Sequence, residues 1–325
     1  MSLPTALACF RPQAPALQEP AHRTASTAAP AGTALARRLA QALATLPERP
    51  QALQPWARVA MRDGPQRQHA LDDALYRLVH GTGNAGAMPW LCALVCAEVA
   101  SLLHWGPATK QALVLAALSQ AGQGSDPARH PSRPDATPMP ACGCRSALCA
   151  RAEATARHLQ QAGVVDGLWL GVVRRQAHRC GDGAALDRLD AIERAARLLR
   201  RVLFFLRLSG RGVGGGRPTL ADAARRACLG HDGVPDELGN ALLQAVGIYP
   251  AGSLLRLRSG EAGVVVGRGP RANLPLVAAL VDWSGAPLVL PGLRHTALAR
   301  HAVQGAWHGA AAGLIVPGQP PRPAP

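Results

Sequence analysis

The helical part of the chain is predicted by leucine, valine and alanine positions that recur every three or four residues, a spacing that places one apolar stripe along a helix. The predicted helices cover residues 34–46, 71–79, 91–103, 111–118, 148–161, 168–178, 186–208, 220–229 and 237–246. Residues 91–103 and 111–118 are apolar on most sides, which is typical of interior helices. We therefore expect these two helices to have buried leucines and to pack against residues 168–173.

Residues at the helix ends support these limits. Pro50 is predicted to stop the first helix, because proline lacks the N–H group that a helix interior needs. Thr219 and Asp222 form a start for the following helix that is similar to a capping box. Gly247 suits the C-terminal end of the last helix, and Pro250 prevents its continuation.

Two β-hairpins are predicted after Pro250. In each, two runs of apolar residues flank a Ser-Gly pair that suits a tight turn. The strands are expected at residues 254–258 and 264–266, and at 276–281 and 288–290. Tyr249 and Pro250 precede them and are predicted to hold this β region on the helices.

The pattern as a whole predicts a mainly α protein, in which a helical bundle is followed by a small antiparallel β appendage. The expected parts are an Ala- and Pro-rich tail at 1–33, a helical domain at 34–246, the appendage at 247–300 and a C-terminal tail at 301–325. The N-terminal tail and the Pro-rich end from 317 lack apolar periodicity, so we expect neither to bury enough surface to fold.

Four stretches of sequence resemble the HD-GYP group of bacterial phosphohydrolase-like proteins. They are NALLQAVGIYPAGSLLRLRSGEAGVVV (240–266), WLCALVCAEVASLLHW (90–105), ALVLAALSQAG (112–122) and LQQAGVVDGLWLGVV (159–173). The resemblance implies an HD-like helical bundle. In the best-known members of this group, two or three metal ions held by histidine and carboxylate side chains hydrolyse cyclic di-GMP.

This chain departs from the family's ligand pattern almost everywhere. The resemblance places the ligand positions at or beside Met88, Ser119, Gln120, Arg151, Gln176 and His178. One imidazole together with amides and a hydroxyl is too weak a set to hold a catalytic metal, and a lone His178 is more typical of a helix surface. The loop at 179–183 also lacks the Gly-Tyr-Pro sequence. We therefore predict no catalytic residue, no metal and no cofactor, in a cleft lined by these six positions.

The arginines near these positions have two interpretations. Arg151 would repel a divalent metal at close range. Together with Arg174 and Arg175, it is a candidate site for an anion, which would hold a phosphate-bearing nucleotide without cutting it. The alternative is that all three are solvated surface residues.

Three other motifs are interpreted as chance matches. His231-Asp232 lies in a Gly-rich loop rather than in an interior helix. The glycine pattern at 210–215 follows a basic helix, whereas a dinucleotide-binding loop follows a strand. The third candidate is a zinc site made of Cys142, Cys144, Cys149 and His130. It lacks the second ligand pair that zinc sites of this kind have, so unpaired loop thiols are favoured.

The net charge of +15 at pH 7 and the pI near 11 are typical of proteins that bind polyanions. Lys110 is the only lysine, however, and aromatic residues make up 3% of the chain, so codon bias explains the arginines as well as function does. Nucleic acid is therefore the less favoured partner. A solvated face of one amphipathic helix is predicted for Arg194, Arg197, Arg200, Arg201 and Arg207.

No apolar run reaches the roughly 20 residues of a membrane span, and the best candidate, 91–103, is interrupted by Glu98. The first residues lack the basic and apolar regions of a signal peptide. Cys92 and Cys96 lie in an apolar helix, where cysteine behaves as a small hydrophobic residue. We therefore expect a soluble cytoplasmic protein with no membrane span.

The function that these patterns favour is that of a catalytically degenerate HD-GYP-like protein, which regulates signalling by binding a partner protein or a cyclic dinucleotide. One alternative is an active phosphodiesterase with a rearranged divalent-metal site. A second alternative is a basic nucleic-acid-binding protein.

Overall fold

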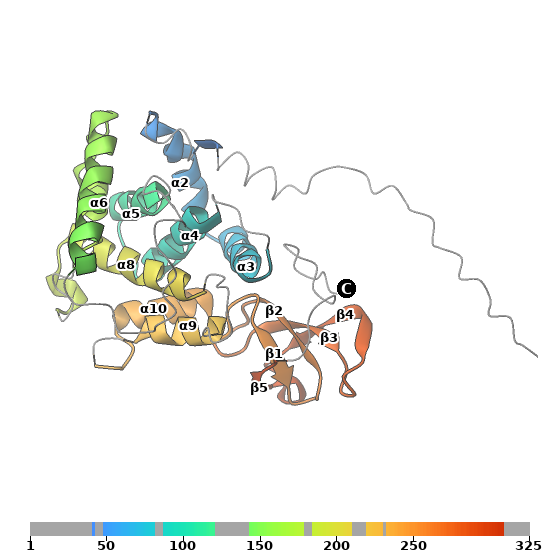
Figure 1. The fold of residues 1–325 in the computed structure, drawn as a ribbon. Coiled ribbons are helices and arrows are strands. Elements are labelled where there is room, and N and C mark those ends of the chain that lie inside the picture. The colour runs from blue at the N-terminus through green and yellow to red at the C-terminus, as the bar shows by residue number, and fades with distance from the viewer. Residues whose placement is uncertain are drawn as a thin grey trace, which may run out of the picture.

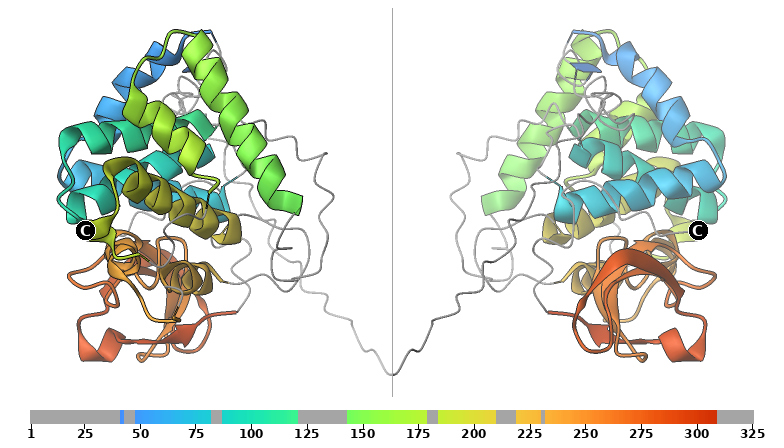
Figure 2. Two further views of the ribbon diagram at one scale, coloured as in Figure 1. Left: turned by 90° about the vertical axis from the view of Figure 1, so that its left-hand side faces the viewer. Right: turned by 90° about the vertical axis from the view of Figure 1, so that its right-hand side faces the viewer.

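A computed structural model describes residues 41–42, 48–81, 87–120, 143–178, 184–209, 219–229 and 232–308, with side chains from residue 148 onward in the segment that starts at 143. The expected tail at 1–33, the loop at 122–142, the glycine pattern at 210–215 and the Pro-rich end from 317 lie outside these residues. The described part is mainly helical, and a five-stranded antiparallel sheet follows the helices in the chain (Figure 1). The sheet lies at one end of the helical bundle (Figure 2).

The helical elements, in chain order, are η1 (Pro50–Leu53), α2 (Gln54–Ala60), α3 (Pro65–His80), α4 (Ala87–Leu102), α5 (Pro107–Leu118), α6 (Gly143–Gln161), α7 (Gly167–Arg175), η3 (Leu186–Arg188), α8 (Ala191–Ser209), α9 (Leu220–Cys228) and α10 (Glu237–Val246). Among the described helices, none combines the length and the apolar character that crossing a bilayer requires.

Several predicted helix limits differ from the structure. The helix predicted at 71–79 begins earlier, at Pro65. Pro50 also begins η1, which leads into α2, because proline at a first helical position loses no hydrogen bond. The helix predicted at 168–178 ends at Arg175. The helix predicted at 186–208 is divided into η3 and α8, because the Asp190 carboxylate accepts a hydrogen bond from the Glu193 N–H and starts a new helix.

The predicted caps at Thr219 and Gly247 are confirmed. Thr219 and Asp222 form a reciprocal capping box at the start of α9. Gly247 has a φ of 82°, a conformation that glycine adopts without steric cost, and its N–H donates to the Leu243 carbonyl at the end of α10.

Helix α4 forms the centre of the bundle, where it packs against α3, α5, α8 and α10. All residues from Leu91 to Ala100 are buried, as are all residues of α5 from Ala112 to Leu118. Helix α5 packs in turn against α7. The prediction that these apolar helices form the interior is therefore confirmed, including the burial of Leu94, Leu113 and Leu115.

The strands are β1 (Leu254–Leu257), β2 (Ala262–Gly267), β3 (Leu276–Val281), β4 (Pro287–His295) and β5 (Val303–Ala306), with the 3-10 helix η4 (Ala299–His301) before the last. Their order across the sheet is β4-β3-β2-β1-β5. The two predicted hairpins are present, with Gly260 and Gly285 at positive φ in their turns.

The sheet extends further than the predicted appendage. Strand β5 lies in the segment expected to be a tail, and it adds to the free edge of β1, where Leu255 lies opposite Ala306. The short sequence Val-Gln-Gly-Ala has almost no apolar periodicity. Its strand conformation therefore comes from pairing with β1 rather than from its own residues.

Two tyrosines cover opposite faces of the sheet. Tyr76 of α3 packs with Val264 and Ala278 on one face, and is buried there. Tyr249 packs with Leu255 and Val265 on the other face, and is half-buried. The ring that is buried between the helices and the sheet is thus Tyr76. The prediction that Tyr249 holds the β region on the helices is wrong, because Tyr249 covers the other face of the sheet.

A cluster of four buried or nearly buried charges also joins the helices to the sheet. We call Arg67, Asp72, Glu98 and Arg268 the charge cluster. Glu98, on the central helix α4, is 4% exposed and accepts a hydrogen bond of 2.6 Å from Arg67 Nε of α3. Arg268, directly after β2, places Nη1 3.4 Å from Glu98 Oε1 and donates from the same nitrogen to the Ala245 carbonyl at 2.6 Å.

Asp72 of α3 completes the charge cluster. Its Oδ1 lies 3.5 Å from Arg268 Nε and has no hydrogen-bond partner among the described residues. Burial raises the pKa of the Asp72 carboxyl to about 6, because loss of water outweighs the attraction of Arg268. The charge of Asp72 therefore changes within the range between weakly acidic and neutral pH.

Stability should depend on pH through Asp72. The pKa of this group is higher in the folded protein than its ordinary 3.8, so the folded state keeps a proton that the unfolded chain has lost. The stabilisation is complete below about pH 4 and is lost as pH rises through about 6. We expect the difference in unfolding free energy between the wild type and Asp72→Asn to change by about 2 to 3 kcal/mol between pH 4 and pH 7 in urea titrations. Parallel pH profiles would contradict this.

Removing the Tyr76 hydroxyl should stabilise the protein. The oxygen is buried and has no hydrogen-bond partner in the described part of the chain, so its loss of water is uncompensated. We expect Tyr76→Phe to raise the free energy of unfolding by about 1 kcal/mol. Tyr76→Ala, which also removes the ring, should lower it by about 3 to 5 kcal/mol. Loss of stability in the phenylalanine variant would show that the hydroxyl is satisfied in solution.

Candidate functional site

Five of the six predicted site positions lie at the ends or first turns of helices, and Arg151 lies in the middle of α6. Met88 is in the first turn of α4, Ser119 and Gln120 follow α5, Arg151 is in α6, and Gln176 and His178 follow α7. Ser119 and Gln176 are buried, Met88 and Gln120 are half-buried, and Arg151 and His178 are exposed.

Hydrogen bonds connect some of these helix ends directly. The Ser119 hydroxyl donates to the Leu115 carbonyl at 2.7 Å and accepts from Trp169 Nε1 of α7 at 3.1 Å. Cys149 Sγ of α6 lies 3.8 Å from the Ala177 carbonyl after α7. Ser119 therefore joins the C-terminal end of α5 to the first turn of α7, and α6 meets α7 at the opposite end of α7, close to Gln176.

Gln176 is an unusual residue at this place. Its side chain is 6% exposed, and within the described residues neither its amide nitrogen nor its amide oxygen has a hydrogen-bond partner. A buried amide without partners costs free energy, so such a group in a native protein calls for an explanation. The resemblance places it where the family has a histidine.

Arg207 of α8 is a site residue that sequence reasoning missed. The pKa of its guanidinium is lowered, first by loss of water and also by the like charge of Arg151, while Cys92 of α4 acts in the opposite direction. The side chain nevertheless keeps substantial solvent exposure. Arg207 of α8 therefore lies within electrostatic range of Arg151 of α6 and Cys92 of α4. From the apolar periodicity of α8, Arg207 was predicted to lie on the solvated face with the other arginines of this helix.

The other two predicted anion-binding arginines have carboxylate partners. Arg174 Nε lies 3.2 Å from Glu153 Oε2, and Arg175 forms an ion pair with Glu193. These are surface pairs, which contribute little stability but occupy the guanidinium groups. We call Arg151 and Arg207, which influence each other electrostatically, the arginine pair.

The described residues contain no group of three or more His, Cys, Asp or Glu side chains that could hold a metal ion. Of the proposed zinc ligands, Cys149 is half-buried, whereas His130 and the side chains of Cys142 and Cys144 lie outside the described residues. His231 and the loop at 179–183 also lie outside them.

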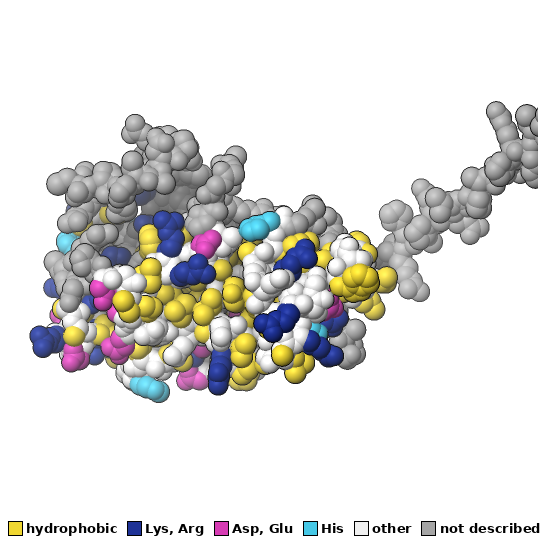
Figure 3. All heavy atoms as spheres, turned by 90° about the horizontal axis from the view of Figure 1, so that it is seen from below, with side chains coloured by type: hydrophobic (Ala, Val, Ile, Leu, Met, Phe, Trp, Pro, Cys, Tyr) yellow, Lys and Arg dark blue, Asp and Glu magenta, His cyan; other side chains and the backbone are white. Residues whose placement is uncertain are grey.

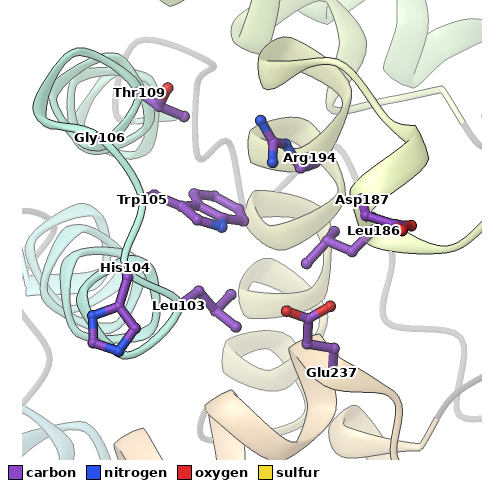
Figure 4. A pocket seen from close by; sticks show the side chains of 9 residues that line it. All are labelled: Leu103, His104, Trp105, Gly106, Thr109, Leu186, Asp187, Arg194 and Glu237. Carbon is purple, nitrogen blue, oxygen red and sulfur yellow. The ribbon is translucent and has the colours of Figure 1, made fainter.

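A separate hollow of about 280 Å³ lies at the opposite ends of α4 and α5. The residues that line it are Leu103, His104, Trp105, Gly106, Thr109, Leu186, Asp187, Arg194 and Glu237. Figure 4 shows Arg194 of α8, Trp105 of the α4–α5 connection and Glu237 of α10 around the same space. Because α4 has 16 residues, this hollow is roughly 20 Å from the Met88 end.

The hollow is mainly a consequence of how α4 ends. His104 takes a φ of 53°, which lets its N–H and that of Trp105 donate back to the Ser101 and Ala100 carbonyls. Arg194 Nε is buried there and has no hydrogen-bond partner among the residues that the structure describes. None of these residues occupies a position that the resemblance assigns to metal or substrate.

No family model matches the sequence, and no curated protein and no solved structure matches it either. The residues of this chain and their placement are therefore the basis for any statement about function.

Ser119→Ala should test the joint between α5 and α7. The substitution leaves the buried Trp169 Nε1 without its acceptor, so we expect the unfolding free energy to fall by about 1 to 3 kcal/mol in urea titrations. Gln120→Ala is the matched control, because its amide bonds only its own helix at the Ala116 carbonyl. In a Trp169→Phe background, Ser119→Ala should cost clearly less. Equal costs in both backgrounds would show that the bond is unimportant.

Proposed function

We propose that this chain is a catalytically inactive, cytoplasmic HD-GYP-like protein that binds a phosphodiester anion, with a cyclic dinucleotide as the leading candidate. The observation that carries the proposal is the arginine pair. Arg151 stands where the resemblance expects a metal-binding histidine, and the pKa of the Arg207 guanidinium is lowered by loss of water and also by the like charge of Arg151. Two neighbouring cations are suited to an anion and unsuited to a divalent metal.

The side chains at the other family positions support binding without hydrolysis. Ser119 is occupied by its hydrogen bonds to Leu115 and Trp169, and Gln176 has a neutral amide. Neither is an anionic or imidazole ligand, and neither can generate a metal-bound hydroxide. A phosphate held by guanidinium groups at this end would therefore remain intact.

Binding of cyclic di-GMP should depend on the arginine pair. We expect calorimetric titration to show that Arg151→Ala and Arg207→Gln each weaken binding by about tenfold or more, since each removes a charge-assisted contact. Arg174→Ala is the control, because this nearby arginine already pairs with Glu153. Thermal unfolding of all variants verifies that the fold is intact. Equal binding by the wild type and both variants would exclude the arginine pair as the site.

Elemental analysis and activity assays test the enzyme alternative. Protein purified without chelator should contain no stoichiometric metal and should not hydrolyse cyclic di-GMP with added manganese or iron. Bound metal together with turnover would establish a rearranged phosphodiesterase site and overturn the proposal. Binding of mixed DNA and RNA with a steep loss in salt, and no binding of cyclic di-GMP, would favour the nucleic-acid alternative.

A further inference from the structure

The sheet region has an uneven charge distribution. Residues 247–308 contain six arginines and two carboxylates, a net charge of +4. Both carboxylates are engaged within the sheet. Glu261 accepts a hydrogen bond of 2.6 Å from Arg294, and Asp282 accepts bonds of 2.8 and 2.9 Å from the Ser284 and Ala286 N–H groups of its own turn.

The same region has a concentration of exposed apolar side chains along β4 and its turns. The exposed fractions are 78% for Trp283, 99% for Val289 and 68% for Leu290. We call these three residues the apolar edge. Single exposed apolar residues are common on proteins, but several together on one edge, beside arginines, are typical of an interaction surface.

A bulge in β4 produces the apolar edge. Val281 pairs with Pro287 and Ala279 pairs with Gly292, so residues 288–291 lie opposite the single residue Leu280. The additional residues loop out of the ladder and expose Val289 and Leu290. Trp283 lies in the turn that begins the strand, next to Gly260 of the β1–β2 turn.

The bulge also makes the edge unsuited to pairing with another strand. Pro287 and Pro291 have no N–H group, and the hydrogen-bonded ladder is interrupted between them. Both features prevent association with the edge of another sheet. The apolar edge therefore offers its side chains rather than its backbone. This argues against a second copy that joins through β4.

Exposed cations lie close to the apolar edge. Arg258 precedes the β1–β2 turn that contacts Trp283, and its N–H donates to the Ala302 carbonyl beside η4. Arg300 lies in η4 itself, and both arginines are exposed. Figure 3 shows the same mixture on the lower face, where yellow apolar groups and dark blue arginines are neighbours at the sheet end.

We propose that the apolar edge docks on the surface of an anionic lipid bilayer. Trp283, Val289 and Leu290 insert to the depth of the headgroups, where tryptophan is favoured, and Arg258 and Arg300 lie against the phosphate groups. Charge complementarity favours this partner, since the sheet region has six arginines against two carboxylates. Glu261 is neutralised by Arg294, and Asp282 is the one carboxylate of the region that adds a negative charge beside the apolar edge. The contact is peripheral and does not depend on the proposed function at the arginine pair.

Co-sedimentation with vesicles tests the proposal on the full chain. We expect the wild type to bind vesicles of phosphatidylglycerol and phosphatidylcholine, and to bind pure phosphatidylcholine vesicles far less. Replacing Val289 and Leu290 together by serine should weaken binding about tenfold or more, because the inserted apolar surface is lost. Val165→Ser is the matched control, since Val165 is 94% exposed on the helical part of the chain. Thermal unfolding verifies that the exposed substitutions leave the fold intact.

Two further measurements test which side chains of the sheet region contact the vesicle. The double variant Arg258→Gln/Arg300→Gln should bind anionic vesicles more weakly than the wild type at low salt. Its binding should also decrease less when salt is added. The vesicle-induced blue shift of tryptophan fluorescence should disappear in Trp283→Phe. Arg151→Ala should bind vesicles as the wild type does, which separates this proposal from the proposed function.

The proposal is overturned by either of two results. The first is that the wild type fails to bind anionic vesicles, or that the double serine variant binds them as strongly as the wild type. The second is self-association in analytical ultracentrifugation that the serine substitutions abolish, without any effect of vesicles. That result would identify a second copy as the partner.

Discussion

The buried carboxylate of Glu98 is the constraint on which the arrangement of the two parts of this molecule depends. An ionised carboxylate within an otherwise apolar helix requires partners of opposite charge, because burying it alone costs several kcal/mol. Arg67 of α3 supplies one partner and Arg268 after β2 supplies the other. A group on the central helix thus draws both a neighbouring helix and the sheet toward itself.

This arrangement explains why the sheet lies where it does. Arg268 reaches Glu98 and the Ala245 carbonyl at the end of α10, while Tyr76 of the same region fills the apolar face of the sheet. The ion pairs fix how the sheet is oriented against the helices, and burial of the apolar surface provides most of the stability of this contact. The opposite edge of the sheet, at β4, is then directed away from the helices and remains open to solvent.

The two functional proposals concern different ends of the molecule and different chemistry. The arginine pair lies on α6 and α8, and its two like charges are suited to a small anion. The apolar edge combines aromatic, aliphatic and cationic side chains on an exposed surface, which is suited to an extended partner. A protein with both could connect the binding of a soluble nucleotide to its presence at a membrane surface.

The apolar periodicity of the chain predicted much of the fold, because a helix that buries one face has apolar residues at every third or fourth position. The interior position of Leu94 and Leu113, the capping box at Thr219 and the helix end at Gly247 all follow from local spacing and local backbone preference. Elements held by distant partners could not be predicted in this way. Strand β5 has almost no pattern of its own, and Pro50 can begin a helix as well as end one.

The candidate site was predictable to a smaller extent. Resemblance identified Ser119 and Gln176, but only the structure showed that Ser119 bonds Trp169 and that Gln176 is buried without a partner. Glu98 is a comparable case, since the sequence marked it as an interruption of an apolar run, whereas in the fold it is the centre of the charge cluster. By itself the sequence determined which segments are helices and which residues are apolar, whereas the replacement of family ligands stays a prediction from the resemblance. The tertiary structure decided which charges meet. The contact between Arg268 and Glu98 depends on how distant segments pack, and the local spacing of residues cannot predict it.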